Sequence, residues 1–249
     1  MKKNNNKSNI EIPKAVLFDT DNTLYDYSIA NASAEEAVSL KAKNLLGINK
    51  KTFFKIYKIA KSEIKSSIPD TASSHSRLLY FQRMIEILGY DAQLLLALDF
   101  EQTFWRTFLA NATLFKGVNE TLLFLKQNKI PIAVVTDLTA QIQLRKLTYF
   151  GLESTFDAVV TSEEVGKDKP DKRNFVLALH KLNLSSNEYF WMIGDNLKAD
   201  IYGAKQLGAS TFQKVHSFVK TGNSIIKPDY IIKDYFVFLK YIRSLFEKK

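Results

Sequence analysis

The sequence has 249 residues, of which 46% are hydrophobic and 24% are charged, a balance typical of a globular protein and not of a disordered or fibrous chain. It contains no cysteine, which excludes disulfide frameworks, thiolate metal sites, iron–sulfur clusters and cysteine nucleophiles. The 35 lysines and arginines outnumber the 26 aspartates and glutamates, so an anionic partner has to be considered. The basic residues are spread along the chain without an RNA-binding signature, and we therefore expect no nucleic-acid partner.

The first residues, 1–12, are polar and basic, and we expect a flexible tail there. They lack the apolar core of a signal peptide. No apolar run approaches the ~20 residues that span a bilayer. These observations predict a cytoplasmic protein without a membrane partner.

Short β-branched or aromatic runs alternate with amphipathic helical patterns over much of the chain. We expect strands at residues 15–18, 130–135, 156–160, 189–193, 210–212 and 230–232. Helices are expected at 118–127, 140–150, 172–182 and 197–207, with a last helix over 234–249. The alternation predicts the α/β fold class, a Rossmann-like core of three layers in which helices cover a parallel sheet.

Residues 27–111 break this alternation because they contain helical patterns with no convincing strand between them. The helices are expected at 30–46, 51–65, 78–88 and 92–109, with breaks at Gly47, Pro69 and Gly89. We therefore expect a helical domain, residues 27–111, inserted into a core made of residues 13–26 and 112–249.

Two carboxylates, Asp19 and Asp21, follow the first predicted strand. In a parallel sheet the binding crevice lies beyond the carboxyl ends of the strands. A pair of acids there can hold a divalent cation, and one acid can act as nucleophile while the other moves a proton. A phosphate ester needs both, because phosphorus must be attacked and a poor alkoxide leaving group must be protonated. The structural alternative is an Asx-turn with a helix cap at Thr23.

Two further strand ends carry polar side chains. Thr136 and Asp137 end the second major strand, where a hydroxyl group and the amides of a helix start could hold phosphate oxygens, although both residue types are also ordinary helix caps. Lys169 follows the third strand and precedes Pro170, which favours an extended Lys169 and suits the first turn of the next helix. The alternative for Lys169 is a solvated charge.

The fourth major strand ends near Asp195, and Asp200 follows in the first turn of the next helix. Asp200 alone is ambiguous, because an acid near a helix start also interacts favourably with the helix dipole. Polar groups at four strand ends of one predicted sheet favour a common site over four unrelated structural roles.

Four ordered segments resemble the motifs of the haloacid dehalogenase-like hydrolase superfamily. They are FDTDNTL at Phe18–Leu24, VVTD at Val134–Asp137, GKDKPD at Gly166–Asp171 and IGDNLKADIYGA at Ile193–Ala204. The residues of these motifs are most similar to those of pyrimidine 5′-nucleotidases and of sugar-phosphate phosphatases such as N-acylneuraminate phosphatase. The resemblance runs from Ala15 to about Tyr241, and the helical insert is similar in position and length to that family's type 1 cap domain.

The resemblance implies a catalytic role for each matching residue. Asp19 would be the nucleophile that becomes an aspartyl phosphate. Asp21 would protonate the leaving oxygen and then activate the hydrolytic water. Thr136, Asp137 and Lys169 would bind the phosphoryl group.

The resemblance also implies a Mg²⁺ site. Asp19, the backbone carbonyl of Asp21 and the carboxylate of Asp195 would be its ligands. Asp200 would bind the ion directly or through a water molecule, or it would orient the residues that bind the ion. A dianionic substrate meets an acidic site only if a metal ion, a lysine and amide dipoles offset the charge.

Three departures from the family pattern bear on this interpretation. Asn22 stands where many relatives carry glycine, and asparagine tolerates a left-handed backbone. Lys167 could also be the phosphate lysine, but the Lys169–Pro170 pair matches the family pattern. The dehalogenases that named the superfamily lack the second acid of the first motif, so the presence of Asp21 disfavours halide chemistry.

We therefore predict a Mg²⁺-dependent phosphatase that hydrolyses a small phosphomonoester, a nucleoside monophosphate or a sugar phosphate, through an aspartyl-phosphate intermediate. The alternatives are a phosphomutase of the same superfamily and a catalytically silent binding module on the same fold. The candidate specificity residues of the cap domain are His75, Arg77, Trp105 and Arg106, although Trp105 also suits a buried core. A monomer or a homodimer is expected.

Overall fold

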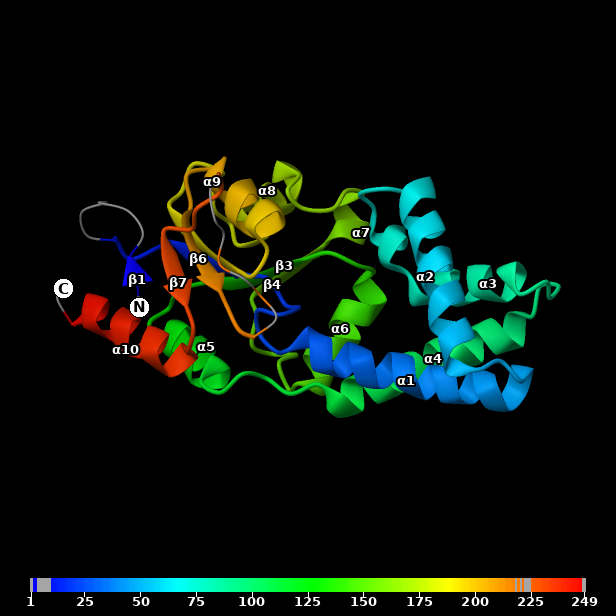
Figure 1. The fold of residues 1–249 in the computed structure, drawn as a ribbon. Coiled ribbons are helices and arrows are strands. Elements are labelled where there is room, and N and C mark those ends of the chain that lie inside the picture. The colour runs from blue at the N-terminus through cyan, green and yellow to red at the C-terminus, as the bar shows by residue number, and fades with distance from the viewer. Residues whose placement is uncertain (1, 4–9, 218, 220, 222–224, 248–249) are drawn as a thin grey trace. The chain divides into compact units, whose positions relative to one another are not determined.

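The computed structural model describes residues 2–3, 10–217, 219, 221 and 225–247. Contacts divide the chain into two compact units, Met1–Asp26 with Thr113–Lys249, and Tyr27–Ala112 (Figure 1). The division assigns Ala112 to the second unit, whereas the sequence analysis assigns it to the core. Part of the expected flexible tail, residues 1 and 4–9, lies outside the described residues.

The first unit contains one mixed sheet. Its strands are β1 Lys2–Lys3, β2 Ala15–Phe18, β3 Ile132–Thr136, β4 Ala158–Thr161, β5 Phe190–Gly194, β6 Ser210–Lys214 and β7 Tyr230–Ile232. Within the described residues they form a seven-stranded sheet in the order β1-β7-β6-β5-β2-β3-β4. The pair β1 and β7 is antiparallel and every other neighbouring pair is parallel. The central strands β2, β3 and β5 are buried along their whole length, as expected where helices cover both faces.

Helices cover this sheet on its two faces. They are α5 Val118–Gln127, α6 Ala140–Tyr149, α7 Ser162–Val165, α8 Lys172–Lys181, the π-helix η2 Leu197–Tyr202, α9 Gly203–Lys205 and α10 Tyr235–Phe246. Helices α5 and α10 lie against each other on one face, and α8 and α9 lie on the other (Figure 1). The predicted three-layer α/β fold class is therefore confirmed.

The core between the sheet and α8 is apolar. Leu17 of β2 and Met192 of β5 lie in one buried cluster with Phe175 and Leu179 of α8. Gly203 of α9 permits a close approach to α8, because an added Cβ would lie 2.7 Å from the ring of Phe175. This cluster supports the strands whose carboxyl ends carry the motif residues of the site described below.

Three local differences from the sequence expectation have physical causes. The helix expected over 197–207 begins as a π-helix, because the N–H group of Ile201 bonds to the carbonyl of Asn196, five residues earlier, at 3.2 Å. Pro170 does not lie in the first turn of α8, since Asp171 caps this helix by accepting a hydrogen bond from the amide of Arg173. Helix α7 was not expected, because four residues are too few to show a helical period.

The second unit is entirely helical. Its helices are α1 Tyr27–Leu46, α2 Lys50–Ser67, the short 3₁₀ helix η1 Ala72–His75, α3 Arg77–Ile87 and α4 Leu94–Asn111. Buried aromatic rings fill its interior, and those of Phe81 and Phe100, for example, meet edge to face at 5.8 Å. Within the described part of the chain, no helix is long and apolar enough to cross a membrane.

Candidate active site

The sheet register brings the motif residues together at one edge. Phe18, the last residue of β2, pairs with Val134 of β3 and with Ile193 of β5. Asp19 therefore leaves the sheet between the ends of these two strands, and its amide donates to the carbonyl of Ile193 at 2.9 Å. The order of the strands, and not proximity in sequence, creates this site.

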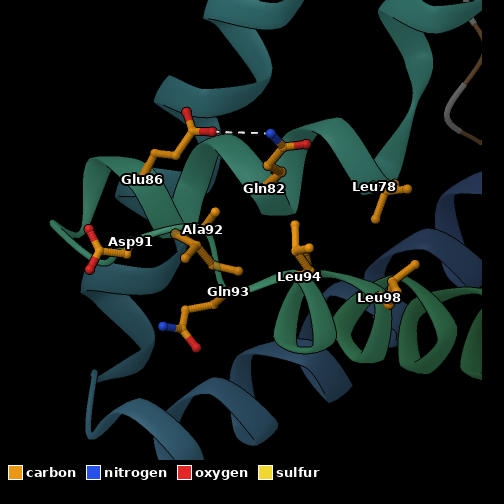
Figure 2. Close-up of a pocket in the computed structure, with 10 residues that line it drawn as sticks. Leu78, Gln82, Glu86, Asp91, Ala92, Gln93, Leu94 and Leu98 are labelled. Atoms are coloured by element: carbon orange, nitrogen blue, oxygen red, sulfur yellow. Dashed lines mark hydrogen bonds between the residues drawn. The ribbon is translucent and has the colours of Figure 1, made fainter.

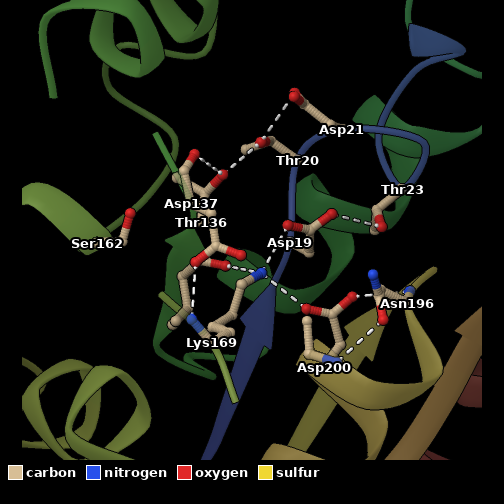
Figure 3. A network of polar contacts seen from close by, with 12 residues as sticks. Asp19, Thr20, Asp21, Thr23, Thr136, Asp137, Ser162, Lys169, Asn196 and Asp200 are labelled. Atoms are coloured by element: carbon tan, nitrogen blue, oxygen red, sulfur yellow. Dashed lines mark hydrogen bonds and ion pairs between the residues drawn. The ribbon is translucent and has the colours of Figure 1, made fainter. Parts of the chain in front are cut away.

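Lys169 lies at the centre of the polar network at this edge (Figure 3). Its Nζ atom is 2.7 Å from Oδ1 of Asp19 and 2.7 Å from Oδ1 of Asp200. It also donates to the carbonyl oxygen of Val135 at 2.9 Å. The side chain is only 1% exposed, so three acceptors hold the ammonium group in a fixed position.

Local structure fixes each partner of this lysine. The amide of Lys169 donates to Oδ1 of Asp137 at 2.9 Å, which anchors the loop before α8 to the end of β3. The other carboxylate oxygen of Asp200 accepts from the amide of Asn196 at 2.9 Å. The hydroxyl of Thr23 donates to Oδ2 of Asp19 at 2.9 Å. Thr23 thus binds the carboxylate of Asp19 directly.

The carboxylates exceed the available positive charge. Burial raises the pKa of Asp19 to about 7, against the opposing effect of Lys169. Burial also raises the pKa of Asp195 to about 9, and the neighbouring Asp19 and Asp200 add to that shift. Both shifts mean that further negative charge is unfavourable here unless a cation enters.

In the remaining charged groups, burial and the charges of the neighbouring side chains also set the pKa. Burial raises the pKa of Asp137 to about 6, although Lys169 opposes the shift. Burial likewise raises the pKa of Asp200. Burial disfavours the charged form of Lys169, but the carboxylates of Asp19 and Asp200 outweigh it and hold the lysine pKa well above its usual value. Lys169 is therefore charged, and one ammonium group faces several carboxylates.

The residues fit a divalent cation. One carboxylate oxygen from each of Asp19, Asp195 and Asp200 lies within 4.8 Å of the others. Carboxylate oxygens are the ligands that hard cations prefer. The excess of acid over base supplies the charge that such an ion would neutralise. A metal site is thus compatible with both the donor atoms and the electrostatics.

Asp21 has a different set of partners from Asp19. Its two carboxylate oxygens accept from Nζ of Lys146 at 2.8 and 3.1 Å, and the hydroxyl of Tyr25 donates to Oδ1. The hydroxyl of Thr20 also donates to Oδ1, at 3.3 Å. In Figure 3 the side chain of Asp21 points away from Asp19.

Thr136 is tied into a buried hydroxyl and amide network. Its hydroxyl oxygen lies 2.8 Å from that of Thr20 and accepts from Nε2 of Gln143 at 2.9 Å. The same amide group donates to the carbonyl of Asp137 at 2.7 Å. The roles assigned to Thr136 and Asp137 in phosphate binding remain predictions.

Sequence reasoning did not select Lys146, Gln143 or Tyr25. Helix α6 buries Gln143 and Lys146 alongside Ile142 and Leu147. A lysine and a glutamine on the apolar stripe of an amphipathic helix are a detectable signal, because such groups are buried only with partners.

The turn at Asn22 adopts the left-handed backbone, with φ of 61°, that asparagine is expected to tolerate.

The four candidate specificity residues all lie in the helical unit. Trp105 is buried, and its ring meets those of Phe104 and Phe108 at 5.0 and 5.3 Å. Arg77 is also buried, with its guanidinium carbon 5.5 Å from the ring centre of Trp105. His75 is half-buried and Arg106 is exposed. The packing gives Trp105 and Arg77 structural contacts inside this unit, and a role in specificity remains a prediction for all four.

The helical unit also contains an apolar pocket between α3 and α4 (Figure 2). It has a volume of about 230 Å³ and is lined by residues that include Leu78, Gln82, Glu86, Asp91 and Leu94. None of the described residues that line it is a lysine or an arginine. The pocket therefore offers no cationic side chain to a phosphate group.

The fold and motifs agree with comparisons to known proteins. The family model described as haloacid dehalogenase-like hydrolase matches residues 13–208. The chain belongs to the haloacid dehalogenase-like hydrolase family. The predicted enzyme class, a phosphatase of this family, is confirmed at that level.

Three similar proteins illustrate the match. A ribulose-1,5-bisphosphate 5-phosphatase of Halopiger xanaduensis is 38% identical over 198 residues, covering 79% of this chain and 82% of that protein. A glyceraldehyde 3-phosphate phosphatase of Methanopyrus kandleri is 30% identical over 198 residues, with coverage of 80% and 82%. The crystal structure of the putative hydrolase YfnB of Bacillus subtilis, bound to magnesium, has a TM-score of 0.69 at 23% identity and covers 93% of this chain and 99% of that one.

Proposed function

We propose that this chain is a Mg²⁺-dependent phosphatase that hydrolyses the phosphomonoester of a small sugar phosphate through a phosphorylated Asp19. The observation that carries the proposal is the buried contact of 2.7 Å between Lys169 and Asp19 at the end of β2. A nucleophilic carboxylate next to a fixed cation can approach an anionic phosphoryl group without prohibitive repulsion.

The first half-reaction transfers the phosphoryl group to the enzyme. A carboxylate oxygen of Asp19 attacks phosphorus, and the bond between phosphorus and the alcohol oxygen breaks. The electron pair stays on the alcohol oxygen, which takes a proton from Asp21. Lys169 stays next to Asp19 and offsets the charge that develops on the phosphoryl oxygens.

The second half-reaction releases phosphate. Asp21, now a carboxylate, takes a proton from a water molecule as its oxygen attacks phosphorus. The bond between phosphorus and Asp19 breaks, which restores the Asp19 carboxylate and yields inorganic phosphate. Asp21 recovers the proton it gave up, so the cycle returns the enzyme to its starting state.

A magnesium site completes this proposal. Asp19, Asp195 and the backbone carbonyl of Asp21 are its proposed ligands, and Asp200 acts on it as an orienting residue. When bound, the ion neutralises phosphoryl oxygens and aligns the ester with the nucleophile. The raised pKa values of Asp19 and Asp195, about 7 and about 9, support a cation at this position. The magnesium in the YfnB structure is a further reason to test this metal first.

The relatives favour a sugar-type substrate over a nucleotide. Their names specify ribulose 1,5-bisphosphate and glyceraldehyde 3-phosphate, both phosphate esters of short sugars. We assign the helical unit, Tyr27–Ala112, the role of a cap domain that selects the substrate, with Arg106 and His75 as its accessible polar candidates. Differences in this unit would then change specificity without changing the chemistry at Asp19.

The test is phosphate release from a panel of ribulose 1,5-bisphosphate, glyceraldehyde 3-phosphate and nucleoside monophosphates, with Mg²⁺ and with EDTA. We expect a sugar phosphate to be hydrolysed fastest, only with metal present, and not at all by Asp19→Asn. Faster hydrolysis of a nucleotide would overturn the substrate class. Equal activity of Asp19→Asn and the wild type would overturn the nucleophile.

A further inference from the structure

Lys146 is a buried lysine at the active-site edge to which the family motifs assign no role. It lies in α6, and its side chain is 1% exposed. Its Nζ atom contacts both carboxylate oxygens of Asp21, at 2.8 and 3.1 Å. Because both oxygens are held, the contact fixes the direction of the whole carboxyl group and not of one atom alone.

Tyr25 completes this arrangement. Its hydroxyl donates to Oδ1 of Asp21, and its ring centre lies 5.9 Å from Nζ of Lys146. The ring of Phe150 in turn meets that of Tyr25 at 4.9 Å. Tyr25 and Lys146 are both buried, so these two contacts of Asp21 have little room to move.

Different lysines contact Asp21 and Asp19. Lys169 contacts Asp19 and Asp200, whereas Lys146 contacts Asp21. The two acids of the first motif are thus positioned by two different buried lysines, one from the loop before α8 and one from α6. Each lysine contacts a group that the proposed reaction uses.

We propose that Lys146 is a positioning residue that fixes the orientation of the carboxyl group of Asp21, the group that exchanges a proton with the leaving alcohol and the attacking water in the proposed reaction. The inference rests on the proposed function, because it needs Asp21 to act as an acid and a base. Lys146 contacts the carboxylate of Asp21 and is assigned no bond-making or bond-breaking step of its own. Its effect on the rate is expected through Asp21 alone.

This role has a signature that a purely structural role lacks. An alkyl phosphate has a poor leaving group and depends on protonation by Asp21, whereas 4-nitrophenyl phosphate has a good leaving group and depends on it little. General acid catalysis contributes about 10²-fold to 10⁴-fold. Loss of position costs part of that factor, so we expect Lys146→Met to lower kcat about 10-fold to 100-fold on an alkyl phosphate and much less on the aryl phosphate.

The experiment measures kcat and KM of the full chain with Mg²⁺, using ribulose 1,5-bisphosphate and 4-nitrophenyl phosphate. The variants are Lys146→Met, Asp21→Asn and their combination. We expect Lys146→Met to lower kcat selectively on the alkyl phosphate with little change in KM, and to add no further loss to Asp21→Asn. A matched control is Lys205→Met, which removes a lysine whose ion pair, with Asp229 at 3.1 Å, lies in the same unit.

A second variant guards against a folding defect in Lys146→Met. Tyr25→Phe keeps the buried ring and removes only the hydroxyl that bonds to Asp21. We therefore expect it, too, to lower kcat more on the alkyl phosphate than on the aryl phosphate, but by a smaller factor than Lys146→Met. Equal losses on both substrates, or no loss, in either folded variant would overturn the role of Lys146. If the wild type hydrolyses neither substrate while Lys146→Met and the wild type are both folded, the proposed function is wrong and the inference falls with it.

Discussion

A Cβ atom added to Gly194 would lie 2.4 Å from both Cγ and Oδ2 of Asp200. Gly194 ends β5, and the space left by its missing side chain is occupied by the carboxyl group that binds Lys169 at 2.7 Å. The glycine therefore has a steric role in the site, and the geometry does not depend on its backbone freedom.

Gly194→Ala is accordingly expected to displace Asp200. The carboxyl group would lose its bonds to Lys169 and to the amide of Asn196. Overpacking of a well-packed site costs about 1–3 kcal/mol, and we expect the free energy of unfolding, measured with urea, to fall by that amount together with phosphatase activity. Wild-type stability and activity in this variant would show that Asp200 can move without consequence.

Burial should decide how much each lysine ion pair contributes to stability. Lys169 to Asp19 and Lys181 to Glu164 have the same separation of 2.7 Å, but the lysine side chains are 1% and 32% exposed. Removal of one partner of a buried pair costs about 3–5 kcal/mol, whereas an exposed pair contributes about 0–1 kcal/mol. In urea unfolding we expect Lys169→Met to be much less stable than Lys181→Met. Similar losses in the two variants would contradict this dependence on burial.

A divalent cation should stabilise the folded chain through the carboxylate cluster. Binding to the folded state alone, at 100 times the dissociation constant, adds about 2.7 kcal/mol to the free energy of unfolding. We expect Mg²⁺ to raise the thermal midpoint of the wild type and to have a much smaller effect on Asp195→Asn.

The control for this measurement is Asp171→Asn. Asp171 lies outside the carboxylate cluster and pairs with Arg173 at 2.9 Å. Its variant should respond to Mg²⁺ as the wild type does. An equal response in Asp195→Asn would remove Asp195 from the metal site.

The sequence predicts the sheet and the place of the site because both depend on local patterns. Apolar runs of strand length identify the buried strands, and the residue that follows each run identifies the edge. The expected strand at 130–135 corresponds to β3, Ile132–Thr136. The strand was thus predicted correctly, and only its ends differ from the expectation. Strand order is not a local property, and only the structure places β2 between β3 and β5.

The missing part of the site has a different cause. Lys146 lies 125 positions from Asp21 in the sequence, and no motif spacing connects them. The pairing appears only when α6 packs beside the turn after β2. The π-helix at Leu197–Tyr202 was also missed, because a shift of the hydrogen bond from four to five residues leaves no distinct pattern in a short segment.

Substitutions at two neighbouring residues of α4 should distinguish a packing role from a role in substrate specificity in the helical unit. Trp105 is buried and Arg106 is exposed. Removal of a buried tryptophan costs about 3–5 kcal/mol, so we expect Trp105→Ala to lower the free energy of unfolding strongly. Arg106→Ala should leave stability within about 0.5 kcal/mol and raise KM for the preferred sugar phosphate. Unchanged KM in Arg106→Ala would exclude this arginine from substrate binding.

Lys214 should make stability depend on pH in the alkaline range. This lysine of β6 is buried, donates to the carbonyl of Val215 at 2.9 Å and lies 4.1 Å from the ring centre of Phe115. Burial lowers its pKa to about 8, although the carboxylates of Asp234 and Asp26 oppose the shift. Between pH 8 and the ordinary lysine value of about 10.4, the unfolded chain therefore binds more protons at this residue than the folded chain.

Where the unfolded state binds more protons, the free energy of unfolding rises with pH. The contribution of Lys214 is thus absent below about pH 8, because both states are then protonated, and it grows as the pH increases toward 10. Other groups titrate in the same range, so the measurement is the difference between the wild type and Lys214→Met in urea unfolding at pH 7.5, 9 and 10. We expect the wild type to gain stability relative to the variant across this series. Parallel pH curves for the two proteins would mean that Lys214 has the same proton affinity in the folded and unfolded chains.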